Sequence, residues 1–478
     1  MTESKNPSAQ ILLERIREGE SLTLAERFAL VAYLAVPAVL AEFSNILMHY
    51  IDAAMVGHYG AHAAAAVGLV STTIWLFWGT TSIFLSGFVV QVAHRIGAKE
   101  FAKARSIMLQ GFVVVTVAAS TMALIGVLIH TRLPYWLGAD ADIAPLSSSY
   151  FVLVAGAFPL SILGWLASGM LRSSGDIKTP SVINVGMCVL DVIFNFVLIF
   201  ESRSVTLAGF TLWVPGAGLG VAGAAIGTIL AELTGLVLLA YTLFAKSPIL
   251  GIRGRFSGIV FSRDTLRRAL TIGAPIGTGR IFMTAAQVAS TMIIAPLGTV
   301  SLASHSLAIT AESLCYMPGY GIGEAAATLS GQTLGARRPE LARQLAWLNV
   351  GVGCAVMATM GVVMFFGAHL IMATLSSDPA VQALGATCLK IEAFAEPLYA
   401  AAIIANGVFT GAGDTFKPVL MNLFSFWGVR ITAMYFLAPV YGLVGVWSAM
   451  CAELCLRGTL FLARLKFGNW SESRVLRD

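Results

Sequence analysis

Long apolar stretches recur along the chain and are separated by short polar segments. A membrane-spanning helix needs about 20 apolar residues. The pattern supplies twelve such runs, at approximately residues 29–56, 64–93, 107–131, 146–171, 180–200, 218–245, 267–296, 301–331, 345–374, 381–410, 418–438 and 441–464. The sequence therefore predicts an all-α integral membrane protein with twelve transmembrane helices.

The polar residues of the first run form a regular series. Glu42, Asn45, His49 and Asp52 are spaced by three, four and three residues, which puts them on one face of a helix. Burying an ionisable side chain at membrane depth costs about 2.5 kcal/mol or more, so such groups usually face a bundle interior or an ion or substrate path. The stripe is typical of a transporter, and Glu42 and His49 are candidates for its cavity. The alternative for His49 is a core histidine satisfied by hydrogen bonds.

The second half of the chain repeats the first at an offset of 238 residues. The offset aligns residues that apolar composition alone would not align: Pro37 with Pro275, Gly60 with Gly298, Gly97 with Gly335, Pro159 with Pro397, Asp176 with Asp414 and Pro180 with Pro418. Internal repeats in membrane proteins are typical of transporters that place substrate where the repeats meet. We therefore predict two six-helix repeats of the same orientation.

Charge and linker composition divide the chain into five segments. They are a cytoplasmic amphipathic N-terminal segment (1–28), a first lobe of spans 1–6 (29–245), a cytoplasmic linker (246–264), a second lobe of spans 7–12 (265–465) and a cytoplasmic tail (466–478). Lys and Arg concentrate in the loops on the side of the N-terminus, so both termini are expected in the cytoplasm and the protein in the cell inner (plasma) membrane. Ser21 or Thr23 is expected to cap a short amphipathic helix on the membrane surface.

Composition excludes other classes of protein. Of the 478 residues 57% are hydrophobic and 12% are charged, whereas about a quarter of an average soluble domain is charged. The net charge of +5 lies in the loops, which does not favour a nucleic-acid surface. The six cysteines fall in apolar runs without a CxxC pair, so we expect neither disulfides nor a zinc site. Without a catalytic motif such as HExxH, we expect no enzyme activity and no cofactor.

Several motifs resemble those of the MATE (multidrug and toxic compound extrusion) family. They are IDAAMVGHYG in the first run, the turns LRSSGDIKTP and FTGAGDTFKP, and GVAGAAIGT at the sixth run. The resemblance covers roughly residues 28–465. It implies a V-shaped, two-lobe exporter that exchanges H+ or Na+ for organic, often cationic, drugs or dyes by alternating access. We expect a monomer whose other contacts are membrane lipids.

The resemblance also implies a cation site in the first lobe. The matching residues are Asp52 as the first-span acid, Asp191 as the fifth-span acid and Thr228 as the sixth-span hydroxyl. Met187 stands where many members have asparagine, which removes an oxygen ligand. Asn184 and Asn195 share the helix face of Asp191 and are expected to compensate. Sodium needs several oxygens and a proton needs one carboxylate, so we favour H+ and keep Na+ at Asp52 and Asp191 as the alternative.

The second lobe differs from the first in charge. Arg280 stands at the position of Glu42, and Ser290 at that of Asp52. Candidates for the substrate cavity or for second-lobe coupling are Arg280, Gln287, Glu312, Glu396 and Tyr399. The alternative is that Arg280, Lys390 or Arg430 neutralises these acids in purely structural pairs. We expect Arg280 or Arg430 to pair with a glutamate of the eighth or tenth span.

Two further expectations complete the sequence-based interpretation. Pro37 is expected to bend the first helix. The second candidate function is a lipid-linked saccharide flippase of the same broad superfamily, which would need an arginine-lined cavity for pyrophosphate. Only Arg280 and Arg430 argue for it.

Overall fold

The computed structural model describes residues 8–207, 210–253, 260–472 and 475. The described part is helical except for one β-hairpin. The linker expected at 246–264 and the two terminal segments lie partly outside the described residues.

The first half of the chain supplies six long helices. Its elements are α1 (Ala9–Glu18), α2 (Leu24–Tyr59), α3 (Ala61–Gly97), α4 (Phe101–Ile129), α5 (Leu133–Trp136), α6 (Ala144–Ser173), α7 (Lys178–Ile199), β1 (Glu201–Leu207), β2 (Phe210–Ala217), α8 (Gly220–Tyr241) and the π-helical turn η1 (Thr242–Lys246). The antiparallel strands β1 and β2 connect α7 to α8. This hairpin was not predicted, because it occupies the interval between two apolar runs that indicated only a loop.

The second half supplies six further spans, two of which are interrupted. Its elements are α9 (Arg263–Ile294), η2 (Ala295–Leu297), α10 (Thr299–Gly335), α11 (Pro339–Leu375), α12 (Pro379–Glu392), α13 (Glu396–Gly411), α14 (Phe416–Leu423), the π-helix η3 (Phe424–Ile431) and α15 (Thr432–Phe467). The tenth run is divided between α12 and α13. The eleventh and twelfth runs meet within α15 at Gly442, whose φ of 58° lies in the left-handed region that glycine adopts readily.

Each of the twelve predicted runs is helical in the structure. By length and apolarity alone, nine described segments are candidate spans. That smaller number arises because residues 416–467 count as one segment, α12 and α13 are each too short, and α10 is rich in glycine, serine and threonine.

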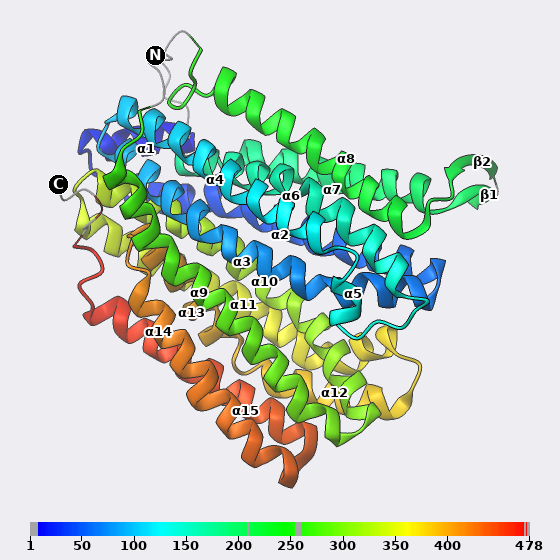
Figure 1. Ribbon diagram of the computed structural model, residues 1–478. Coiled ribbons are helices and arrows are strands. Elements are labelled where there is room, and N and C mark those ends of the chain that lie inside the picture. The colour runs from blue at the N-terminus through cyan, green and yellow to red at the C-terminus, as the bar shows by residue number, and fades with distance from the viewer. Residues whose placement is uncertain (1–7, 208–209, 254–259, 473–474, 476–478) are drawn as a thin grey trace.

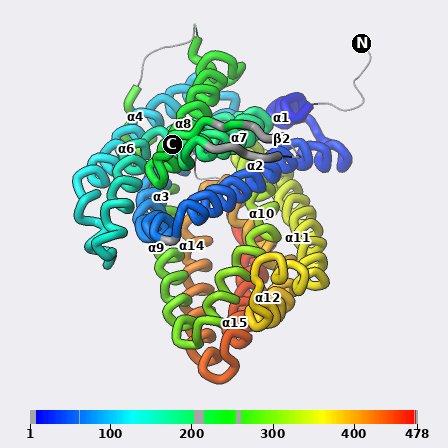
Figure 2. Tube along the Cα trace, turned by 90° about the vertical axis from the view of Figure 1, so that its right-hand side faces the viewer, coloured from blue at the N-terminus to red at the C-terminus, as the bar shows by residue number. Residues whose placement is uncertain are grey.

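The two halves of the chain form two bundles that lie side by side. In Figure 1 both chain ends lie at the left, which we call the terminal end, and the β-hairpin lies at the opposite end, the hairpin end. The helices α2 and α3 of the first half pack against α10 and α9 of the second (Figure 2). These four helices form the seam between the halves.

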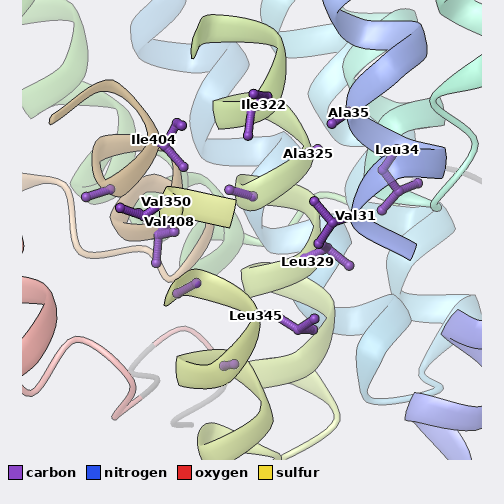
Figure 3. Packing of buried hydrophobic residues seen from close by; sticks show 14 of the residues in the cluster. Val31, Leu34, Ala35, Ile322, Ala325, Leu329, Leu345, Val350, Ile404 and Val408 are labelled. Atoms are coloured by element: carbon purple, nitrogen blue, oxygen red, sulfur yellow. The ribbon is translucent and has the colours of Figure 1, made fainter. Parts of the chain in front are cut away.

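Helix α2 begins in contact with the opposite half of the molecule. Near the terminal end it contributes to an apolar cluster in which Figure 3 labels Val31, Leu34 and Ala35 of α2, Ile322, Ala325 and Leu329 of α10, Leu345 and Val350 of α11, and Ile404 and Val408 of α13. Pro37 lies inside α2, which stays helical through it. Helix α10 packs closely on α2 just after Pro37. A β carbon added at Gly321 of α10 would lie only 2.6 Å from Val39 N, so glycine allows this approach.

Two glycines related by the repeat allow α3 and α10 to touch at the seam. A β carbon added at Gly97 would lie 2.2 Å from the carbonyl oxygen of Gln332, and one added at Gly335 would lie 2.2 Å from that of His94. Both distances are far below van der Waals contact. Gly97 and Gly335, which are equivalent in the repeat, thus both lie where α3 crosses α10.

Two hydrogen bonds across the seam are also copies of each other. His94 Nε2 lies 2.8 Å from the carbonyl oxygen of Gly411, and Gln332 Nε2 donates to the carbonyl oxygen of Ser173 at 2.8 Å. The offset of 238 relates His94 to Gln332 and Ser173 to Gly411. The halves therefore meet around an approximate twofold axis near the terminal end.

The terminal segments cover equivalent turns of the two halves. Leu13 of α1 lies against Gly175, where an added β carbon would come within 2.3 Å of its Cδ1. Val475 covers Gly413, the repeat partner of Gly175, in the same way, at 2.5 Å from its Cγ2. Each chain end thus packs on a glycine turn beside the seam.

The sequence-based interpretation of the N-terminal segment was wrong in two respects. The apolar face of α1 is buried against the protein, with Leu12 and Leu13 fully enclosed, because it meets the apolar cluster of α2, α10 and α11. Thr23 caps α2 rather than a surface helix, since it forms a capping box with Glu26.

Candidate functional site

Three polar side chains of α2 and α7 form a hydrogen-bonded cluster in the first half. Asn195 Nδ2 donates to Asp52 Oδ1 at 2.9 Å and to Asp191 Oδ2 at 3.1 Å. Asp191 and Asn195 are fully buried, and Asp52 is half-buried. One amide therefore bridges two carboxyl groups that come from different helices.

Helix α8 closes this cluster from the side. A β carbon at Gly227 would lie 2.0 Å from Asn195 Oδ1, so only glycine lets α8 approach α7 here. The hydroxyl of Thr228, the next residue, interacts with Asp191. The small residues of the GVAGAAIGT motif thus allow the third predicted residue to join the two acids.

The cluster has unused acceptors. Asp191 Oδ1 and Asn195 Oδ1 are buried and have no hydrogen-bond partner in the described part of the chain. A buried polar atom without a partner costs about 1–3 kcal/mol. A proton on Asp191, or a cation between these oxygens, would satisfy them.

Two residues near the cluster were missed or left unassigned by sequence reasoning. Tyr150 of α6 has Asp52, Glu232 and Asp191 as electrostatic neighbours. The hydroxyl of Ser161 donates to the carboxylate of Glu232. Glu232 follows Thr228 by one helical turn, which was a usable signal, whereas nothing in the sequence distinguished Tyr150.

Other predicted residues of the first lobe lie apart from the cluster. Asn184 makes no side-chain hydrogen bond among the described residues. Met187 points to α8, where a β carbon at Gly235 would lie 2.9 Å from its Sδ. Met187 thus contributes no oxygen to the cluster, and Asn195 is the asparagine that joins the acids.

The polar stripe of α2 is divided between two surroundings. His49 is exposed and has Asp52 as its charged neighbour. Glu42 lies instead near an ion pair that links the halves, between Arg172 of α6 and Glu324 of α10. The stripe therefore extends from the acid cluster at Asp52 to the seam at Glu42.

In the second half, Glu453 of α15 is held between two arginines. Arg430 donates through Nε to Glu453 Oε2 at 2.8 Å, and Arg457 Nε lies 3.1 Å from Glu453 Oε1. All three side chains are buried. The prediction that Arg430 would pair with a glutamate of the eighth or tenth span was wrong, because η3 turns Arg430 toward α15.

Three further glutamates lie beside this group, since Glu312 and Glu392 have Arg430 as an electrostatic neighbour and Glu396 has Glu312. Glu312, Glu392 and Glu396 are buried, and both carboxyl oxygens of Glu392 and of Glu396 lack a hydrogen-bond partner in the described structure. Glu392 has Glu312, Arg430 and Glu396 among its electrostatic neighbours. The cluster thus contains four carboxyl groups, with Glu453, against two guanidinium groups.

Tyr399 lines the same region, whereas Arg280 and Gln287 do not reach it. The ring of Tyr399 lies 5.5 Å from that of Tyr316 and 5.3 Å from the guanidinium carbon of Arg457. Arg280 and Gln287 are exposed on α9, and Arg280 has no ion-pair partner among the described residues. The predicted pairing of Arg280 with a glutamate was therefore wrong.

We expect Glu453→Gln to destabilise the protein strongly. It leaves Arg430 and Arg457 buried without a counter-charge, and breaking a buried ion pair from one side typically costs about 3–5 kcal/mol. The thermal unfolding midpoint of the purified protein in detergent should fall by several degrees. The matched change Glu18→Gln, at an exposed site at the end of α1, should leave it unchanged. A Glu453→Gln variant as stable as the parent would show that the ion pairs of Glu453 with Arg430 and Arg457 do not stabilise the fold.

The chain matches proteins of known type over nearly its whole length. The MatE family profile matches residues 37–197 and 275–436. A probable multidrug resistance protein NorM of Thermotoga maritima is 25% identical over 451 residues, 93% of each chain. The multidrug resistance protein NorM of Burkholderia vietnamiensis is 26% identical over 435 residues, 88% of this chain and 90% of that one.

Solved structures share the fold. An outward-facing multidrug resistance MATE family transporter of the MOP superfamily superposes with a TM-score of 0.85 at 18% identity over 99% of both chains. A MOP superfamily transporter from Pyrococcus furiosus, described as having a binding pocket of reverse polarity, gives 0.83 at 17% identity over 99% of both. The predicted fold of twelve helices in two bundles is confirmed.

Proposed function

The chain belongs to the MatE family of multi-pass membrane transporters, and from this membership we propose that it is a secondary active multidrug efflux antiporter. It exchanges H+ for organic, cationic compounds by alternating access. The observation that carries this proposal is the cluster of Asp52, Asn195 and Asp191, whose two carboxyl groups share one amide donor.

This geometry favours a proton as the coupling ion. Two carboxylates beside each other repel, and a proton on one of them removes the repulsion. A cationic substrate nearby would favour the ionised state, so proton and drug would compete for the same charge. Sodium needs several oxygen ligands, and Met187 places sulfur against α8 instead of oxygen in the cluster. Sodium at Asp52 and Asp191 remains the alternative coupling ion.

The second lobe supports a further titratable site. With two arginines against four carboxyl groups, the cluster is neutral only when two protons are bound. Glu392 and Glu396 have free oxygens to receive them. We assign Glu312, Glu396 and Tyr399 to second-lobe coupling, and Arg280 and Gln287 to the substrate path between the lobes.

We further propose that both termini face the cytoplasm and that the protein lies in the plasma membrane. The terminal end carries both chain ends (Figure 1) and most of the basic loop residues, as the positive-inside rule requires. Labelling of a cysteine introduced at residue 5 by an impermeant thiol reagent in intact cells would contradict this orientation.

The experiment that tests the function is dye transport in inverted membrane vesicles. An acidic lumen should drive dye accumulation, and collapse of the pH gradient should stop it. An imposed sodium gradient at constant pH should have no effect. Accumulation that follows sodium and ignores pH would contradict proton coupling, and no gradient-driven accumulation with any dye would contradict efflux itself.

The lipid-linked saccharide flippase is less well supported. It would need free arginines in the cavity for a pyrophosphate. Arg430 is instead engaged by Glu453. Arg280 alone makes a poor site for a group with several negative charges.

A further inference from the structure

A groove opens at the terminal end where α2 of the first half meets α11 of the second. It consists of two adjoining cavities of about 330 and 480 Å³ that share Arg27, Glu340 and Gln344. The other lining residues are Ser21, Leu24, Arg337, Arg338, Pro339, Leu341, Arg343, Trp347 and Leu348. We call it the α2–α11 groove.

The polar part of the groove is strongly basic. Arg27, Arg337, Arg338 and Arg343 line it against the single acid Glu340, and none of the four forms an ion pair within the described ranges. Three of them donate to neutral oxygens: Arg27 to the Leu22 carbonyl at 3.0 Å, Arg343 to the Ser471 hydroxyl at 3.0 Å, and Arg338 to the carbonyls of Ile16 and Glu20. A guanidinium has five donors, so most of them remain available to an anion.

The other part of the groove is apolar and exposed. Leu24 of α2 is 63% exposed and Trp347 of α11 is 42% exposed. Phe28, one turn further along α2, is also exposed. Both helices continue from here as membrane spans, so the arginines lie at the membrane boundary and the apolar side chains on its hydrocarbon side. Tryptophan is enriched at such boundaries.

The two halves differ in how the basic residues of this turn are paired. The equivalent turn of the first half has Lys99 at the position of Arg337 and Glu100 at that of Arg338. Glu100 pairs with both Arg95 and Lys103. Burial would raise the pKa of Glu100, but the hydrogen bonds from Lys103 and Arg95 outweigh it and leave this pKa below its usual value. A glutamate of the first-half turn thus pairs with two of its basic residues, whereas none of the four arginines of the groove is paired in the described part of the chain.

We propose that the α2–α11 groove binds the phosphate headgroup of an anionic phospholipid from the leaflet at the terminal end, with its acyl chains along Leu24 and Trp347. Guanidinium groups match phosphate oxygens in charge and in bidentate geometry. Because α2 and α11 belong to different halves, the bound lipid bridges the seam. It therefore stabilises the contact between the two halves at the terminal end.

The test is native mass spectrometry of the whole protein, released from detergent and titrated with phosphatidylglycerol or phosphatidylcholine. The test variants are Arg337→Asn and Arg27→Gln, alone and together. Lys99→Asn is the matched control, since Lys99 and Arg337 are repeat partners with φ of 60° and 57° and asparagine tolerates this conformation. Separate titrations with inorganic phosphate ask whether the anion binds without a lipid.

The expected result is a phosphatidylglycerol site whose affinity falls at least fivefold in the double variant and remains unchanged in Lys99→Asn. Phosphatidylcholine should bind more weakly and respond to neither change. The proposal is overturned if both lipids bind alike, if Lys99→Asn loses as much affinity as the groove variants, or if phosphate alone displaces the lipid at equal concentration. If the double variant fails to fold, each single variant tests the same proposal through a smaller loss of phosphatidylglycerol affinity.

Discussion

Asp52→Asn is expected to abolish drug efflux driven by a pH gradient. Asparagine has nearly the same shape, and its Oδ1 can still accept the hydrogen bond that Asn195 Nδ2 donates at 2.9 Å to the carboxyl group. The substitution therefore preserves the packing of α2 against α7 and removes only the group that can gain and lose a proton. Dye accumulation in inverted vesicles with an acidic lumen should fall to the background of vesicles without the protein.

The controls separate coupling from folding and binding. Asp52→Asn should reach the membrane in normal amounts and still bind dye, measured by fluorescence polarisation of the purified protein. Asp191→Asn should weaken transport to a similar or somewhat smaller degree, because Asp191 shares the amide of Asn195. Asp142→Asn makes the same chemical change at an exposed site in the turn between α5 and α6 and should have no effect. Transport by Asp52→Asn at the parent rate would exclude this cluster as the proton site.

The partners of the acid cluster were largely predictable from sequence, for a physical reason. Helical periodicity places Asp191 and Asn195 on one face, and the glycines near Thr228 allow close approach of another helix. Tyr150 was not predictable, because its position beside the acids depends on how α6 packs on α8 and α3, and the three serines that precede it indicate no particular partner. Sequence periodicity identifies a face, but it does not identify the helix opposite.

The stripe on α2 shows a second limit. Glu42 and Asp52 share a face, yet they serve different surroundings, since α2 is 36 residues long and crosses from one half of the molecule to the other. Its first part packs on α10 and α11, and its last part on α7. A single interpretation of the whole stripe therefore could not be correct for both acids.

The partner of Arg430 was predicted wrongly because the backbone departs from the regular helix there. The π-helix η3 changes the face on which Arg430 lies, which directs it to Glu453. The tenth span breaks between Glu392 and Glu396, ahead of Pro397, whereas α6 continues through the repeat partner Pro159. The repeat therefore predicted correctly which residues of the two halves are equivalent, but it did not predict where the helices of the second half depart from those of the first.

The repeat also identifies the place where the halves should be most sensitive to change. We expect Gly335→Ala and Gly97→Ala to open the seam at the terminal end and to impair efflux strongly. Alanine normally stabilises a helix over glycine by roughly 1 kcal/mol, so any loss must come from contact with the facing helix. The added β carbon would lie 2.2 Å from a backbone carbonyl oxygen in both cases, His94 for Gly335 and Gln332 for Gly97.

The size of the effect follows from the rigidity of that contact. Backbone oxygens cannot move away as a flexible side chain can, so α3 and α10 must separate. This separation would also strain the two hydrogen bonds related by the repeat, between His94 and the Gly411 carbonyl and between Gln332 and the Ser173 carbonyl. Overpacking of this kind costs about 1–3 kcal/mol, which corresponds to a shift of roughly 5- to 150-fold toward the open state.

The measurement is the rate at which a thiol reagent labels Ser173→Cys, in a background without the six native cysteines. Residue 173 is buried beside the seam in the closed arrangement, so labelling should accelerate in Gly335→Ala and in Gly97→Ala while dye efflux falls. Gly351→Ala is the matched control, because a β carbon there meets nothing within 4 Å. It should leave labelling and transport unchanged and raise the unfolding temperature slightly. If Gly335→Ala labels and transports like Gly351→Ala, the contact between the two repeat-related glycines does not hold the halves together, and the seam must open elsewhere along α2 and α10.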